Sequence, residues 1–325
     1  MHKTISLALG SICAIFLFFT MISAIRFVQS AWQPPQLQHR EEDRYRLVLV
    51  TQDLGTPFWN DVGEGAEAEA RRLGANLEVW GTYGEDREDF LKQLEIAIDS
   101  KVDGIIVQGM DEDAFDNLTK VKAAFYGIPI ITVASDVPMS ESMRKTYVGS
   151  DALAAGKLIA NTLIADMGGE GTVVLMGDQR EEYDQRQRVE GIRSVLDRHP
   201  GIRIEYVTSS DEEEKIVAAT QNVMNYFPNV NAFISVDANL TPAMVQEIGR
   251  RSQVEPYHIY SFDDNPDILA LLRQGKLDGV IQQSPSEMGE TGVRMMMQWL
   301  EGETVPLDAE GYLTDIRMLT TEGAQ

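Results

Sequence analysis

Short apolar runs alternate with longer amphipathic stretches along most of this chain. The apolar runs, rich in β-branched residues, cover 46–50, 77–80, 104–107, 128–133, 172–176, 202–207, 232–236 and 258–262. A helical pattern follows each run, and the first two helices are predicted to begin at Asn60 and Arg87. Such alternation is typical of parallel sheets whose two faces are covered by helices. We therefore predict an α/β fold with doubly wound, Rossmann-like sheets.

The strand–helix pattern falls into two series. The first ends with the run at 127–132, and the second starts after 147–151, where a long helix is predicted. Because a single hydrophobic core stops growing at about 250–300 residues, a chain of 325 residues is expected to form two lobes. We place the boundary between them near Ser150.

The N-terminus carries a segment suited to a membrane. Residues 5–25 contain no charged side chain. A helix needs about 20 apolar residues to span a bilayer, whereas a signal-peptide core has about 7–15. We interpret residues 1–30 as an uncleaved membrane anchor and 31–44, with Pro34 and Pro35, as a linker. The alternative is cleavage after Ser30, because Val28 and Ser30 are small enough for a signal peptidase.

In both interpretations the rest of the chain is exported. We expect it at the extracytoplasmic face of the cell membrane, held by the N-terminal segment, or secreted or periplasmic after cleavage. The formal net charge of −23 argues against nucleic acid as a partner, because a phosphate backbone is bound by Lys and Arg.

The residues of common catalytic and metal sites are sparse. Cys13 is the only cysteine, which excludes an intramolecular disulfide and a cysteine-based zinc site. The four histidines stand at positions 2, 39, 199 and 258, without metal-ligand spacing, and no serine lies in a G-x-S-x-G elbow. We predict a binding protein rather than an enzyme, with neither a cofactor nor a metal.

Several short motifs together resemble one known family. They are 56–59 (TPFW), 104–113, 127–132, 149–151 with 156–157, 186–191 (RQRVEG), 262–263 and 275–277 before Gln283. In this order and spacing they resemble the ribose- and galactose-type periplasmic sugar-binding proteins, within the type 1 periplasmic binding protein superfamily. The resemblance implies two lobes joined by a three-strand hinge, with the ligand between them. It implies a first lobe of 45–150 plus about 284–312 and a second of 151–283 plus about 313–325.

Geometry leads to the same cleft, because ligands of open α/β sheets bind outside the carboxyl ends of the strands. A sugar presents apolar C–H faces and hydroxyl groups, so its site needs aromatic walls together with amides, carboxylates and guanidinium groups. The candidate ligand-binding residues are Gln52, Thr56, Phe58, Trp59, Gln108, Arg186, Asp211, Asp237, Asp263 and Gln283.

Each candidate also has a structural interpretation. Phe58 and Trp59 are expected to wall the cleft, or else to pack at a helix start. Arg186 is expected to donate to ring oxygens, as the family's cleft arginine does, or to be solvated at a helix start. Asp263 is expected to accept from two hydroxyls, or to cap the helix near Pro266. For Gln108 and Gln283 the alternative is hydrogen bonding within a loop or the hinge.

Three positions depart from the family pattern. Ala134 stands where the family has a sugar-binding Asp, Asp237 where ribose-type proteins have Asn, and Asp211 where they have an aromatic residue. Asp136, two residues after Ala134, is expected to cap a turn more readily than to reach the ligand. The cleft is therefore expected to be more acidic than a ribose site, which suits a more hydroxylated or partly cationic ligand.

Residues 184–185 and 237–239 also resemble those of autoinducer-2 receptors. In such receptors a Lys is expected near the position of Gln52 and an Asp at the position of Ala134, and this chain has neither. We therefore expect a hexose or pentose, captured by hinge closure for an ABC permease. The alternative is a membrane-tethered sugar sensor that signals to a histidine kinase, and an autoinducer-2-type receptor is a more distant one.

Overall fold

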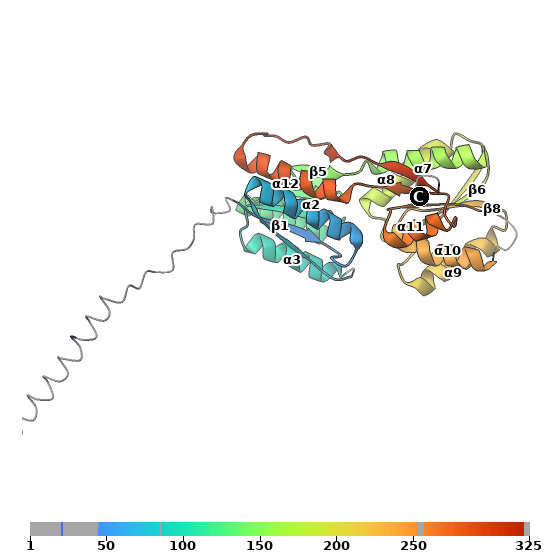
Figure 1. Cartoon of the computed structure of the whole chain (residues 1–325), viewed down its shortest axis with the longest axis horizontal. Coiled ribbons are helices and arrows are strands. Elements are labelled where there is room, and N and C mark those ends of the chain that lie inside the picture. The colour runs from blue at the N-terminus through green and yellow to red at the C-terminus, as the bar shows by residue number, and fades with distance from the viewer. Residues whose placement is uncertain (1–20, 22–44, 85, 252–256, 322–325) are drawn as a thin grey trace, which may run out of the picture. The chain divides into compact units, whose positions relative to one another are not determined.

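The structure is a computed structural model that describes residues 21, 45–84, 86–251 and 257–321 (Figure 1). The predicted anchor at 1–30, apart from Met21, and the predicted linker at 31–44 lie outside these ranges. Within them, no helix has both the length and the apolar character needed to cross a membrane.

The first lobe contains a six-stranded sheet of order β11-β5-β4-β3-β1-β2, in which every pair is parallel. Its strands are β1 (Arg46–Thr51), β2 (Asn76–Gly81), β3 (Gly104–Gln108), β4 (Ile130–Val133), β5 (Thr146–Gly149) and β11 (Tyr312–Leu313). Residues 104–107 of β3 and all of β4 are buried, as expected of strands covered on both faces.

Helices cover both faces of this sheet. They are α2 (Pro57–Leu73), α3 (Arg87–Asp99), α4 (Asp113–Asp116), η1 (Asn117–Ala123), α5 (Ala124–Tyr126), α6 (Met139–Ser142) and α12 (Pro285–Glu301). One apolar core lies between the sheet and α2 with α12, and a second lies on the α3 side. Gly65 of α2 and Gly289 of α12 allow these helices to pack closely, because a Cβ at either position would overlap a backbone oxygen of the other helix.

The second lobe repeats the plan with a sheet of order β12-β10-β9-β8-β6-β7. Its strands are β6 (Glu170–Asp178), β7 (Gly201–Ser209), β8 (Val230–Ser235), β9 (His258–Phe262), β10 (Gly279–Gln282) and β12 (Arg317–Thr320). Its helices are α7 (Ala152–Met167), α8 (Tyr183–Leu196), α9 (Glu213–Tyr226), η2 (Ala238–Leu240), α10 (Thr241–Arg251) and α11 (Pro266–Arg273). An apolar core again lies on each face of the sheet.

One strand pair departs from the predicted parallel pattern. β12 runs antiparallel to β10, whereas the other described pairs of both sheets are parallel. β12 is an edge strand that follows directly from β11 of the other sheet rather than from a crossover helix. An antiparallel edge strand on an otherwise parallel sheet is common. The predicted α/β class, with two doubly wound lobes, is confirmed.

The chain passes between the two sheets three times. The passages lie between β5 and α7, between β10 and α12, and between β11 and β12. After the second passage α12, drawn in orange-red, lies beside α2, drawn in blue (Figure 1). Three passages between the lobes give the connection that a hinge requires.

Local capping fixes where the helices next to the cleft begin. α2 starts at Pro57, earlier than the predicted Asn60, because the Thr56 hydroxyl accepts from the Trp59 amide at 3.4 Å and proline suits the first helical turn. α3 begins at the predicted Arg87, where the Asp86 carboxylate accepts from the Asp89 amide at 3.0 Å.

Candidate functional site

A cavity of about 930 Å³ lies between the two lobes at the carboxyl ends of their strands. This volume is within the range of about 300–1,000 Å³ that is typical of small-molecule sites. Both lobes and the second passage between them contribute to its lining. Of the predicted site residues, the lining includes Gln52, Thr56, Phe58, Trp59, Gln108, Asp237, Asp263 and Gln283.

Two aromatic rings from the start of α2 form part of the first-lobe side. Phe58 and Trp59 meet edge to face, with ring centroids 5.5 Å apart. Trp59 is 8% exposed and belongs to the core between the sheet and α2, whereas Phe58 is half-buried. The two alternatives for these residues therefore coexist, because Trp59 both packs at the helix start and lines the cavity.

Neutral amides stand beside the rings. The Gln108 side-chain oxygen accepts from the Thr51 hydroxyl at 3.1 Å and from the Gln52 backbone amide at 2.9 Å. These bonds orient the Gln108 carboxamide at the end of β3, so its amide nitrogen is the group with donors to offer. We call Gln52, Phe58, Trp59 and Gln108 the aromatic wall.

The second lobe presents a buried arginine. Arg188 of α8 is 9% exposed, donates from Nη1 to the Val236 carbonyl at 2.9 Å, and lies 4.5 Å from the centroid of the Phe262 ring. Its Nη2 is 3.6 Å from a carboxylate oxygen of Asp184. Burial opposes its charge, but the carboxylates of Asp263, Asp184 and Asp237 raise the pKa of Arg188 above its ordinary value.

Asp237 follows β8 and is held by two donors. One carboxylate oxygen accepts from the Asn239 backbone amide at 2.9 Å, and the other accepts from the side-chain nitrogen of Gln185 at 2.8 Å. Burial raises the pKa of Asp237 to about 7, although the Asn239 amide and Arg188 act in the opposite direction. The carboxyl group is therefore divided between its neutral and charged forms near neutral pH.

Asp263 lies at the end of β9 in an uncommon backbone conformation. Its φ of 61° is in the left-handed region, as is the φ of 62° at Ala134 after β4. The Gln283 side-chain nitrogen donates to the Asp263 carboxylate, which links the second lobe to the passage between lobes. Asp263 does not cap α11, because Asn265 fills that role by accepting from the amides of Asp267 and Ile268. We call Asp184, Arg188, Asp237 and Asp263 the charged wall.

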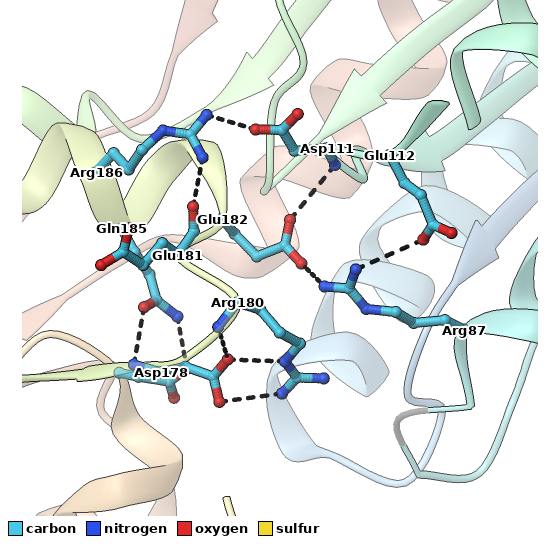
Figure 2. A network of polar contacts seen from close by, with 10 residues as sticks. Arg87, Asp111, Glu112, Asp178, Arg180, Glu181, Glu182, Gln185 and Arg186 are labelled. Atoms are coloured by element: carbon cyan, nitrogen blue, oxygen red, sulfur yellow. Dashed lines mark hydrogen bonds and ion pairs between the residues drawn. The ribbon is translucent and has the colours of Figure 1, made fainter. Parts of the chain in front are cut away.

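Two predicted residues do not line the cavity. Arg186 is exposed on α8 and bonds to the Asp111 carboxylate and the Glu181 carbonyl (Figure 2). Asp211 is exposed after β7. Asp136 does not line it either, because its carboxylate binds the Arg144 guanidinium at 2.7 Å and the Thr132 hydroxyl at 2.6 Å. These positions give no support to the predicted ligand-binding roles of Arg186 and Asp211.

The motif at 186–191 has two arginines, and the cavity lining includes Arg188 rather than the predicted Arg186. Arg188, Asp184 and Gln185 line it instead, and all three lie on one face of α8. Helical periodicity contained the signal: position 188 is in phase with the buried Ile192 and Val195, whereas position 186 is on the opposite side.

Ion pairs from Arg87 to Glu182 and from Arg186 to Asp111 connect the two lobes. Arg87 of α3 pairs with Glu182, which precedes α8, and its other nitrogen lies 3.5 Å from Glu112 (Figure 2). The Asp111 backbone amide donates to Glu182 at 3.4 Å. Burial raises the pKa of Glu182 above its ordinary value, and Arg87 opposes this shift. We call Arg87, Asp111, Glu112, Glu182 and Arg186 the interlobe clasp.

Known proteins share both the sequence pattern and the fold. The ribose import binding protein RbsB of Salmonella typhimurium is 25% identical over 275 residues, which cover 84% of this chain and 90% of RbsB. GanP, a glucose-galactose binding protein from Geobacillus stearothermophilus, has 29% identity and a TM-score of 0.80, with 86% of this chain and 98% of GanP covered. A chain of the XylFII–LytSN complex has 26% identity and a TM-score of 0.75, with 86% and 98% covered.

The family model described as a periplasmic binding protein domain matches residues 47–304. This region includes every described residue of the cavity lining. The resemblance expected from the short motifs is confirmed, and the chain belongs to the periplasmic binding protein domain family.

Proposed function

We propose that this chain is an extracytoplasmic solute-binding protein that captures a monosaccharide-sized polyol and delivers it to an ABC permease. The observation that carries the proposal is the cavity of about 930 Å³, whose lining joins aromatic rings of one lobe to carboxylates and a guanidinium group of the other. The names of RbsB and GanP, which state ribose import and glucose-galactose binding, support the same class of ligand.

The mechanism follows from the two walls. A sugar ring stacks its C–H face on Phe58 while its hydroxyls exchange hydrogen bonds with Arg188 and Asp263. Because these groups belong to different lobes, the ligand makes its full set of contacts in the closed arrangement alone. That differential contact shifts the hinge equilibrium towards closure.

The primary test is a thermal-shift screen of the protein against pentoses, hexoses and their reduced or amino derivatives. At a ligand concentration of about 100 times Kd, binding adds about 2.7 kcal/mol to the free energy of unfolding, so a true ligand raises the melting temperature by several degrees.

Asp263→Ala is expected to abolish this ligand response, because Asp263 lines the cavity. Asp211→Ala is the matched control, since Asp211 lies outside the lining. A screen without any hit, confirmed by calorimetry at millimolar ligand, would contradict the proposal.

A second function has support from one comparison. XylFII was solved in a complex with LytSN, so a protein of this fold can assemble stably with a protein partner. Together with the apolar segment at 5–25, this favours a membrane-tethered sensor whose closed form engages a histidine kinase. Purified permease and kinase ectodomain from neighbouring genes distinguish the two functions, according to which one binds the protein when ligand is present.

A further inference from the structure

The cavity carries far more negative than positive charge. Ten lining residues are acidic: Asp53, Asp61, Asp178, Glu182, Asp184, Asp237, Asp263, Asp264, Glu287 and Glu290. Two lining residues, Arg180 and Arg188, are basic, and the lining contains no lysine among the described residues. A neutral sugar needs hydroxyl partners, but it does not need this excess of charge.

Protein cations compensate part of the excess. Arg180 binds both oxygens of Asp178, at 2.8 and 3.3 Å, and Arg87 pairs with Glu182 (Figure 2). The charged wall differs, because Asp184, Asp237 and Asp263 share the single guanidinium group of Arg188. Two of these carboxylates already outnumber the one guanidinium group, and Asp237, whose pKa burial raises to about 7, carries part of a further negative charge near neutral pH.

Asp237 and Asp264 are half-buried in the cavity wall, where burial disfavours the charged forms of their carboxyl groups. Burial raises the pKa of Asp237 to about 7, and burial also raises the pKa of the neighbouring Asp264 above its ordinary value. An uncompensated carboxylate in a low-dielectric site is costly, and a bound cation removes that cost. The acidic lining of the cavity therefore favours a ligand with positive charge.

A small hollow beside Arg188 provides a second, independent observation. It is lined by Ser150 and Tyr147 together with four residues of the main lining, Ala134, Asp184, Arg188 and Gln283. Ser150 is 7% exposed, and its hydroxyl oxygen has no hydrogen-bond partner among the residues that the structure describes. Buried polar groups without a partner are uncommon in proteins, so this hydroxyl is available to a ligand group or to a water bound with it.

We propose that the ligand is a polyol that carries an ammonium group, such as an amino sugar or an aminocyclitol, and that the ammonium binds among Asp184, Asp237 and Asp263. This inference rests on the proposed function, because it concerns the same cavity. An ammonium group has three donors and no acceptor, which matches the carboxylate oxygens of the charged wall. The hydroxyls and C–H face of the same ligand then meet Gln108 and Phe58 of the aromatic wall.

The test compares ligands that differ at one position. Calorimetry with the full chain uses glucosamine against glucose, galactosamine against galactose, and an aminocyclitol against its parent cyclitol. We expect the amino member of at least one pair to bind tighter by about tenfold or more, since charge-assisted hydrogen bonds are roughly twice as strong as neutral ones. Salt is expected to reduce the preference less than it would for an exposed ion pair.

Asp237→Asn removes one charge of the wall while keeping its shape. It is expected to lower the ratio of amino to neutral affinity at least about threefold, and Asp184→Asn serves as a second variant if the first fails to fold. Asp211→Asn is the matched control, because it makes the same substitution outside the cavity. It is expected to leave the ratio of amino to neutral affinity unchanged.

The outcomes separate the two proposals. A preference for the amino member that falls in Asp237→Asn supports the inference. Neutral sugars that bind as tightly as or tighter than every amino partner overturn the inference and leave the proposed function standing. An absence of binding by all members overturns both.

Discussion

The two walls of the cavity differ in what they offer a ligand. The aromatic wall of the first lobe has two rings and neutral amides, and it shares Trp59 with the lobe's own core. The charged wall of the second lobe has a buried guanidinium group and three carboxylates, which interact with one another before any ligand arrives. The difference suggests that the first lobe provides shape and the second provides chemical selectivity. Substitutions in the charged wall of the second lobe are therefore expected to change stability more than substitutions in the aromatic wall.

The largest effect is expected from removing Arg188. Arg188→Met keeps a long side chain but leaves Asp184, Asp237 and Asp263 without their shared cation. Breaking a buried ion pair costs about 3–5 kcal/mol, so the melting temperature should fall and the ligand response should disappear. Thermal denaturation with and without ligand measures both effects.

Arg186→Met is the matched control, because Arg186 is on the same helix but exposed. It should retain the ligand response with a small change in melting temperature. The assignment to the charged wall is wrong if Arg186→Met loses ligand binding and Arg188→Met does not.

The second effect is a pH dependence of the ligand-free protein. The pKa of Asp237 is raised from 3.8 to about 7 on folding, so between these values the folded state binds a proton that the unfolded state does not. Stability therefore falls as the pH rises from about 4 to 7 and is constant above that range, with a total contribution on the order of 1–4 kcal/mol.

Asp237→Asn should remove this part of the slope. Urea denaturation of both proteins at several pH values gives the difference, which isolates Asp237 from Asp264, Glu182 and the other titrating groups. Because Asn cannot titrate, equal slopes in the two proteins would show that Asp237 is not buried in the way the charged wall requires.

The aromatic wall should show a smaller and different response. Phe58 is half-buried at the cavity, so Phe58→Ala should weaken ligand binding by about tenfold through lost ring contact and apolar burial, with little effect on the free protein. Calorimetry measures the affinity, and melting temperature checks the fold. Phe125→Ala is the control, since Phe125 is 81% exposed and outside the lining. An unchanged affinity in Phe58→Ala would remove Phe58 from the site.

Cavity residues at the ends of strands were easier to predict from the sequence than cavity residues on a helix. The β-branched runs predicted the strands. Because ligands of open α/β sheets bind outside the carboxyl ends of the strands, those ends predicted Gln108, Asp237 and Asp263 as cavity residues. For the residues of α8, the prediction also needed to identify which face of the helix points into the protein. Arg186 is two positions from Arg188 and lies on the other face.

Other features depended on contacts that no local pattern contains. The contacts of the interlobe clasp that cross between the lobes join residues 71 or more positions apart, such as Asp111 and Glu182. The burial that raises the pKa of Asp237 comes from the assembled lobe rather than from residues 237–239. The sequence predicted an acidic cleft from Asp211 and Asp237, of which Asp237 lines the cavity and Asp211 does not, and the grouping of three carboxylates around Arg188 depends on the fold.

The smallest expected effect concerns the clasp that connects the two lobes. Arg87→Gln removes the pair with Glu182, which acts only when the lobes are close together, and a second pair with Glu112 of the same lobe. These side chains are partly exposed, so the loss should destabilise the closed arrangement by about 0.5–1 kcal/mol and weaken ligand binding about two- to fivefold. Calorimetry measures the affinity, and small-angle scattering reports whether the ligand-free protein expands.

Arg71→Gln is the matched control, because Arg71 pairs with Glu67 within α2 and never crosses the cleft. If both variants bind ligand equally well, the clasp does not contribute to closure, and the two walls are brought together by the ligand and the hinge alone.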